Sequence, residues 1–184
     1  MFRSVDLTLS TLGIIFLTPV FLIVCILCFI DTGSPFYRQI RIGKNGVTFH
    51  LIKFRSMKTN TPSVISHKAD ARNITTLGKF LRRSKIDELP QLWNVLKGEM
   101  SLVGPRPGLP EHIELIRERQ RLNVFSVRPG ITGLSQIKNI GMSEPSLLAQ
   151  TDAKMISELS TYSYFKYIFL TLMGGGQGDK ISDL

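Results

Sequence analysis

The stretch that decides the fold is Leu7–Ile30, LTLSTLGIIFLTPVFLIVCILCFI, which contains no charged side chain. At about 1.5 Å per helical residue, it is longer than the roughly 30 Å hydrocarbon core of a bilayer. We therefore expect it to enter a membrane as a helix. Pro19, which follows Thr18 near the middle of the stretch, removes one backbone hydrogen bond and predicts a kink.

The charges that flank this stretch indicate how it enters the membrane. Basic residues prefer the cytoplasmic face, and here they lie on both sides: Arg3, Arg38, Arg41 and Lys44. This favours a re-entrant helix, broken at Thr18-Pro19, in which Thr18 satisfies a freed carbonyl. An ordinary transmembrane anchor is the alternative. A cleaved signal is disfavoured because its apolar run is typically only about 7 to 15 residues.

Length and charge limit the rest of the chain. Its 184 residues allow one soluble domain of ordinary size beside the membrane segment. We expect a membrane anchor at 1–32, a folded cytosolic domain at 33–173 and a flexible tail at 174–184. Lys and Arg outnumber Asp and Glu by 23 to 14, which favours anionic partners. Cys25 and Cys28 lack the second ligand pair of a zinc site and are interpreted as small apolar residues.

Short extended runs follow the apolar stretch. Phe36–Ile42 and 47–57 flank an Asn-Gly pair, which predicts a β-hairpin. Lys53 and Arg55 alternate on its second strand, so they are predicted to share one face. They either face phosphate or belong to a solvated strand face. Residues 59–70 are expected to form a surface loop.

Four helices are predicted after this loop. Their ranges are 74–83, a segment from about Asp87 to Lys97, 111–123 and 146–159, and an apolar aromatic run follows at 162–173. The last run lies either against the bilayer or in the core. The apolar side chains expected to face inward are Leu77, Phe80, Leu81, Leu89, Leu92, Trp93, Leu96, Ile113, Leu115, Ile116 and Leu122. The fold class is thus α+β: a re-entrant helix and a small, mainly helical domain with a β-hairpin.

Two adjacent carboxylates, Asp87 and Glu88, follow a cluster of cations that includes Arg82. Pro90 is harmless only in the first turn of a helix, which places Asp87 close to the N-cap. One interpretation is structural, because Asp is a favoured N-cap. The other is catalytic, because helix amides and nearby cations keep a carboxylate ionised and attract phosphate.

Further downstream, two loops could approach an anionic ligand. Arg106 lies in the rigid sequence Gly104-Pro105-Arg106-Pro107, and a guanidinium binds phosphate oxygens in a bidentate manner. Arg128 begins the sequence RPGITG, whose two glycines permit close approach of the backbone to a ligand. Asp152 is expected at a polar position of its helix.

Four motifs together resemble the bacterial sugar transferase family. They are KFRSM at 53–57, DELPQL at 87–92, NVLKGEMSLVGPRP at 94–107 and PGITG at 129–133. Members of this family are monotopic phosphoglycosyl transferases, and the resemblance covers nearly the whole chain. It implies transfer of a sugar-1-phosphate from a UDP-sugar to undecaprenyl phosphate, with release of UMP. This reaction starts assembly of a surface glycan at the cytoplasmic face of the inner membrane.

The resemblance also implies residue roles. Asp87 matches the nucleophile that forms a phosphosugar-aspartyl intermediate, and Glu88 matches its partner in the dyad. Both are expected near Mg²⁺, the metal of the family. The cations that match phosphate-binding positions are Lys53, Arg82 and Arg106, while Thr18-Pro19 takes the place of a Ser-Pro helix break and Asp152 matches a late acidic position.

The partners expected from the resemblance are a UDP-sugar, undecaprenyl phosphate and membrane lipids, with a homodimer also considered and no nucleic acid. Leu134–Asn139 departs from the Trp and Gln-Val-Asn-Gly usual in the family, so the donor sugar and the pathway stay open. A membrane-bound phosphohydrolase that uses Asp87 with water as acceptor is the alternative enzyme. A non-enzymatic module that binds anionic lipids is the alternative outside enzymes.

Overall fold

The computed structural model describes residues 2–59 and 73–176, which fall into two compact units. The first unit holds residues 2–39 and the described part of 51–96. The second holds residues 40–50 and 97–176. The predicted loop at 59–70 lies almost entirely outside the described residues, as does most of the predicted tail at 174–184. The predicted division at 32 and 173 stays a prediction.

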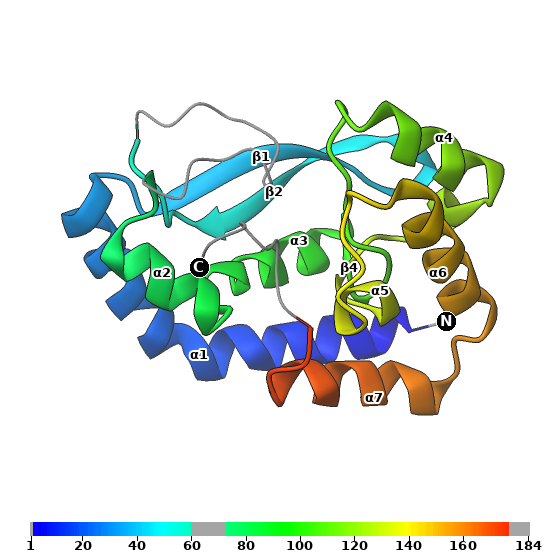
Figure 1. Cartoon of the computed structure of the whole chain (residues 1–184). Coiled ribbons are helices and arrows are strands. Elements are labelled where there is room, and N and C mark those ends of the chain that lie inside the picture. Colours follow the sequence, from blue (N-terminus) through cyan, green and yellow to red (C-terminus); the bar gives the residue numbers. More distant parts are fainter. Residues whose placement is uncertain (1, 60–72, 177–184) are drawn as a thin grey trace. The chain divides into compact units, whose positions relative to one another are not determined.

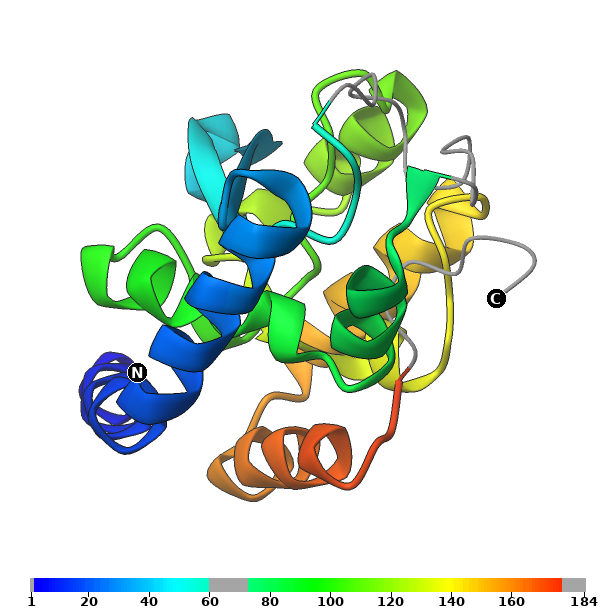
Figure 2. The same cartoon turned by 90° about the vertical axis from the view of Figure 1, so that its left-hand side faces the viewer.

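The first unit is built around the long apolar helix α1 (Arg3–Thr32). The helix continues through Pro19 without interruption, so the expected break is at most a bend inside one helix. Figure 2 shows the axis of α1 changing direction along its length. Thr18 Oγ1 donates to the carbonyl of Ile14 at 2.7 Å. The carbonyl that lacks an amide partner because of Pro19 is that of Ile15, four residues before the proline, so this is not the bond that was expected.

Both ends of α1 pack on the rest of the first unit. Arg3 donates through Nη1 to the carbonyl of Val95 at 2.6 Å and through Nη2 to that of Leu96 at 3.0 Å. Near the other end, Cys28 is fully buried, and its Sγ lies 3.5 Å from the carbonyl of Arg55. Most large apolar side chains between these points are exposed, including Phe16.

The core of the first unit joins α1 to the hairpin and to α2 (Thr76–Arg83). Phe54 has its ring between those of Phe21 and Phe36, with both centroids 5.5 Å away. The buried members of this core are Val24, Cys28, Phe54 and Leu81. Thr75 caps α2 by accepting a bond from the amide of Gly78 at 2.9 Å. The core thus fixes the position of the strand end that carries Lys53.

The predicted hairpin is confirmed. It consists of β1 (Phe36–Ile42) and β2 (Thr48–Phe54), joined by a tight turn at Lys44–Gly46 in which Asn45 has a φ of 57°. Strand β2 ends at Phe54 and not at Met57, because Met57 makes an isolated bridge with Ile74 instead.

Two residues that were predicted to lie in the core are exposed, so these predictions are wrong. Phe80 on α2 is 60% exposed and Trp93 on α3 (Gln91–Lys97) is 55% exposed. The stripe that is buried on α3 contains Leu92 and Val95. The error arises because a short helix offers several apolar faces, and only its tertiary neighbours decide which face is buried.

The second unit contains a parallel pair of three-residue strands, β3 (Ser101–Val103) and β4 (Gly130–Thr132), in which Ser101 lies opposite Gly130. Its helices are α4 (Ile113–Arg121), α5 (Leu134–Ile137), α6 (Pro145–Ser157) and α7 (Thr161–Leu172). Helices α4 and α6 lie side by side (Figure 1) and bury Leu115, Leu148 and Ala149 between them. Ile113, expected in the core, is exposed.

The apolar aromatic run at 162–173 forms helix α7. Ser160 and Ser163 form a capping box at its start. Tyr164 is fully buried, whereas Tyr162, Phe165, Phe169 and Leu172 are exposed. Part of this helix therefore belongs to the core, and an apolar face of it stays open.

Candidate functional site

Asp87 and Glu88 lie in a short 3₁₀ turn, η4 (Ile86–Glu88), between α2 and α3. Lys85 enters this turn with a φ of 58°, which reverses the chain directly after α2. Helix α3 begins only at Gln91, so Asp87, which was expected close to the N-cap, lies four residues before the first helical residue. The acidic pair is instead presented on a tight turn, with Asp87 only 7% exposed.

Lys53 is brought to this turn from the end of β2. Its Nζ lies 2.9 Å from Oε1 of Glu88, and the two side chains are 17% and 14% exposed. Strand β2 is tied to α3 because the amide of Ile52 donates to Oδ1 of the fully buried Asn94 at 3.1 Å. The cation and the acidic pair are therefore held by neighbouring elements with little freedom to separate.

Two more of the predicted cations lie in the first unit. Arg82 donates through Nε to Oγ of Ser56 at 2.8 Å, which fixes it at the end of α2. Arg55 donates through Nη2 to the carbonyl of Phe36 at 3.2 Å, and its guanidinium lies 5.7 Å from the ring centroid of Tyr37. Lys53 contacts the acidic turn, whereas Arg55 is engaged by strand β1.

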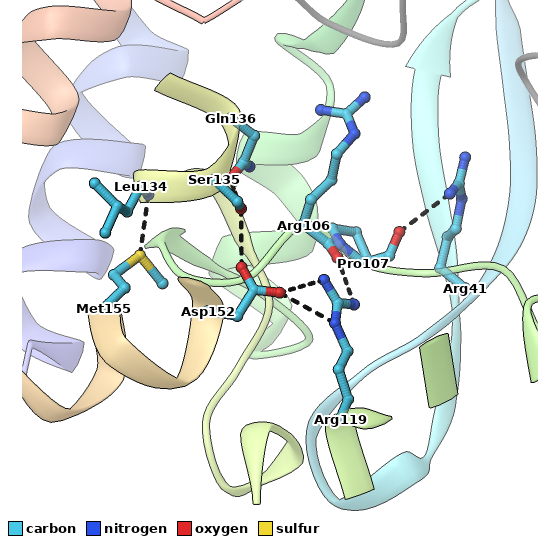
Figure 3. A network of polar contacts seen from close by, with 9 residues as sticks. All are labelled: Arg41, Arg106, Pro107, Arg119, Leu134, Ser135, Gln136, Asp152 and Met155. Carbon is cyan, nitrogen blue, oxygen red and sulfur yellow. Dashed lines mark hydrogen bonds and ion pairs between the residues drawn. The ribbon is translucent and has the colours of Figure 1, made fainter. Parts of the chain in front are cut away.

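Arg106 and Arg128 belong to the second unit. The Nε of Arg128 donates to the carbonyl of Gly98 at 2.7 Å, so this side chain braces the chain just after α3. The guanidinium of Arg106 points away from Asp152 and Arg119 (Figure 3). Their roles in binding phosphate stay predictions.

The glycines of the RPGITG segment closely approach another part of the chain, and the expected approach to a ligand stays a prediction. A Cβ built on Gly130 would lie 2.0 Å from the amide nitrogen of Gly104, and one on Gly104 would lie 2.5 Å from the carbonyl oxygen of Arg128. The amide of Gly104 also donates to the carbonyl of Thr132 at 2.9 Å. The close approach thus serves the pairing of β3 with β4.

Asp152 is fully buried and not at a solvated polar position. Figure 3 shows its contacts with Arg119 and Ser135. Its Oδ2 accepts from Nη2 of Arg119 at 2.6 Å and from Nε at 3.1 Å, and its Oδ1 accepts from Oγ of Ser135 at 2.8 Å. Burial raises the pKa of the Asp152 carboxyl, while the charge of Arg119 and the hydrogen bonds from Ser135 and Arg119 act in the opposite direction.

The pattern of α6 contained a signal for this burial. Asp152 is spaced three and four residues from Met155 and Leu148, so all three lie on the same helical face. A carboxylate on an apolar face requires a cationic partner. Arg119 was missed because α4 is rich in charge, and no local feature separates its buried arginine from the exposed ones.

The carboxylates of Asp87 and Glu88 fit a magnesium site that substrate phosphates complete. No group of three or more acidic, histidine or cysteine side chains suited to a metal occurs in residues 2–59 and 73–176. However, Mg²⁺ is commonly held by one or two carboxylates together with substrate phosphates. The adjacent pair offers this donor set, with Lys53 beside it.

The chain matches the model of one protein family, described as bacterial sugar transferase, over residues 1–176. This match covers nearly the whole chain. The chain belongs to the bacterial sugar transferase family.

Some relatives of this bacterial sugar transferase are named for a reaction or a product. It is 37% identical to the UDP-glucose:undecaprenyl-phosphate glucose-1-phosphate transferase of Escherichia coli K12, over 94% of this chain and 39% of that protein. It is 41% identical to the exopolysaccharide production protein ExoY of Sinorhizobium fredii, over 73% of this chain and 67% of that protein. An uncharacterized sugar transferase of Haemophilus influenzae is 35% identical, over 92% of this chain and 40% of that protein. The chain thus spans about two fifths of the length of several relatives.

Proposed function

We propose that this chain transfers a sugar-1-phosphate from a UDP-sugar to undecaprenyl phosphate and releases UMP, as an early step in the synthesis of a surface glycan. The observation that carries the proposal is the buried Asp87, next to a Glu88 that is ion-paired with Lys53, in a chain of this family. The name of the Escherichia coli relative, a glucose-1-phosphate transferase to undecaprenyl phosphate, supports the substrate class.

The proposed first step is covalent. A carboxylate oxygen of Asp87 attacks the β-phosphorus of the UDP-sugar, an acyl-phosphate bond forms, and the bond from the β-phosphorus to the oxygen of UMP breaks. UMP leaves with the electron pair of that bond. The ammonium of Lys53 lies at the acidic turn, where it offsets negative charge as a dianionic donor approaches a carboxylate.

In the second step, a phosphate oxygen of undecaprenyl phosphate attacks the same phosphorus. The new diphosphate bond forms as the acyl-phosphate bond breaks, and Asp87 is restored as a carboxylate. Glu88 assists this attack. Asp87 and Glu88 would hold Mg²⁺, which supplies neutralisation of the diphosphate charge when bound. Arg82 and Arg106 are proposed to bind phosphate oxygens, as their motif positions imply.

We further propose that α1 dips into the inner membrane from the cytoplasmic face and returns. The helix is long and apolar enough to cross a bilayer. Yet Arg3 at its start and Cys28 near its end both contact residues of the first unit. A helix that spanned the membrane would separate these two ends on opposite sides, which their shared partners in one unit disfavour. No contact among the described residues bears on a homodimer, which stays a prediction.

The test is UMP release in detergent micelles with undecaprenyl phosphate and a panel of UDP-sugars that includes UDP-glucose and UDP-galactose. Steady UMP release that depends on undecaprenyl phosphate supports the proposal and identifies the donor. Steady release in its absence, beyond one equivalent per enzyme, supports a phosphohydrolase. No release with any donor contradicts both enzymatic functions.

A further inference from the structure

The loop that carries Arg106 is held by hydrogen bonds to three consecutive carbonyls. Arg119 Nη1 donates to the carbonyl of Arg106 at 2.8 Å, and Arg41 Nη1 donates to that of Pro107 at 3.1 Å. The amide of Ile42 donates to the carbonyl of Gly108 at 3.0 Å. Arg41 and Arg119 are each only 2% exposed. Two buried guanidiniums thus donate hydrogen bonds to the backbone of one loop.

The carboxylate of Asp152 offsets the free-energy cost of burying the charged Arg119 side chain. This carboxylate accepts hydrogen bonds from Nε and Nη2 of the Arg119 guanidinium. The remaining nitrogen, Nη1, donates to the carbonyl of Arg106. The other carboxylate oxygen accepts from Ser135, in the segment that follows β4. Both oxygens are therefore engaged inside the protein and neither is exposed, so Asp152 is not placed to touch a substrate or a metal.

The opposite side of the loop bears the side chain of Arg106. Figure 3 shows its guanidinium directed away from Asp152 and Arg119, while its carbonyl points toward Arg119. Prolines on both sides of Arg106 restrict the loop further. The two prolines and the bond from Arg119 to the carbonyl of Arg106 together restrict the direction in which the Arg106 side chain leaves the backbone.

We propose that Arg119 and Asp152 are positioning residues for the transfer reaction, acting by fixing the backbone of Arg106 so that its guanidinium meets substrate phosphate. This rests on the proposed function, because it takes Arg106 as a phosphate ligand. A buried ion pair contributes little net stability compared with apolar residues of the same volume. Here the pair holds Arg119 so that it donates to the carbonyl of Arg106, a bond that a shorter or non-planar side chain does not make in the same geometry.

The decisive variant is Arg119→Lys. A lysine keeps the positive charge beside Asp152, but its single ammonium does not reproduce a fork that binds a carboxylate and a carbonyl at once. A small displacement of a binding group costs up to about 100-fold in rate. We expect Arg119→Lys to lower kcat/KM for the best UDP-sugar by roughly tenfold or more. Arg121→Lys on the same helix, where Arg121 is exposed and pairs with Glu118, is the matched control and leaves activity unchanged.

A double-mutant cycle separates positioning from general structural damage. In an Arg106→Met background, adding Arg119→Lys is expected to lower kcat/KM by less than about twofold, because the group it positions is already gone. Losses that multiply, or an Arg106→Met variant with normal activity, overturn the inference while the proposed function stands. Inactivity of the unmodified protein with every donor is the failure of the proposed function itself.

Thermal unfolding of each variant shows whether it folds. If Arg119→Lys does not fold, the neutral pair Arg119→Gln with Asp152→Asn replaces it in the same cycle. This pair removes both buried charges and keeps a side-chain oxygen at 152 that can accept from Ser135. The glutamine at 119 is too short to reach the carbonyl of Arg106. The same non-additivity with Arg106→Met supports the inference, and multiplicative losses overturn it.

Discussion

At the scale of single residues, the proposed chemistry rests on an acidic turn in which Glu88 is ion-paired with Lys53 at 2.9 Å. The sequence shows that Asp87 and Glu88 are adjacent, that cations precede them, and that they begin the DELPQL motif. The sequence does not show the turn itself, because the turn depends on Lys85 adopting a left-handed backbone conformation that lysine seldom adopts. The pairing of Glu88 with Lys53, 35 residues away, needs the tertiary fold.

Replacement of Lys53 by Met tests the electrostatic part of the mechanism. This change removes the charge and keeps most of the side-chain volume, so we expect kcat/KM for the UDP-sugar to fall by about 10- to 100-fold. Lys154→Met is the control, because Lys154 and Glu158 form a more distant pair in which both side chains are 61% exposed. Equal activities of the two variants would show that Lys53 has no role in the reaction.

At the scale of elements, long periodic segments were predictable and short paired ones were not. Helix α1, the hairpin and α6 follow from hydrophobic pattern and turn residues. Strands β3 and β4 have three residues each, too few to show an alternation, and their parallel pairing joins segments far apart in the chain. The glycines of RPGITG were visible, but only the fold shows that they face Gly104.

Substitution of Gly130 by Ala tests this crossing of two backbones. The new Cβ would lie 2.0 Å from the amide nitrogen of Gly104, so one strand has to move. We expect a loss of about 3 kcal/mol or more, which lowers the melting temperature by roughly 6 °C or more. Gly141→Ala is the control, because a Cβ added there would have its nearest neighbouring atom 3.5 Å away, an ordinary van der Waals contact. Melting temperatures that do not differ between the two variants would contradict the packing of β3 on β4.

Arg3 links α1 to α3 by an interaction that the sequence did not indicate. The last carbonyls of a helix have no partners within it, and a cation is favourable there. Arg3→Ala removes two charge-assisted bonds to Val95 and Leu96, so we expect a loss of about 1 to 3 kcal/mol in the free energy of unfolding. Exposed Arg38, replaced by Ala, is expected to change it by less than about 0.5 kcal/mol. Denaturant titration in micelles of the two variants provides the comparison.

At the scale of the whole molecule, the family and the long apolar helix α1 were predictable because both rest on patterns that local sequence carries. The sequence carries two signs of the proposed re-entrant topology, the flanking charges and Pro19. The contacts of Arg3 and Cys28 with residues of the first unit add a physical reason, since they hold both ends of α1 to one folded unit.

Cysteine labelling tests the proposed topology. Ser4, which is exposed, is replaced by Cys in a Cys25→Ala, Cys28→Ala background, and intact cells are treated with a membrane-impermeant thiol reagent. A re-entrant helix keeps residue 4 in the cytoplasm, so we expect labelling only after the cells are permeabilised. Labelling in intact cells would show that α1 spans the membrane.

The most direct test of the central claim is covalent capture on Asp87. Purified protein is incubated with the active UDP-sugar, radiolabelled in the β-phosphate, without undecaprenyl phosphate, and is then denatured and counted. The account predicts up to one equivalent of label and of UMP per protein, and neither on Asp87→Asn. Equal labelling of the two proteins, or normal turnover by Asp87→Asn when undecaprenyl phosphate is added, would contradict it.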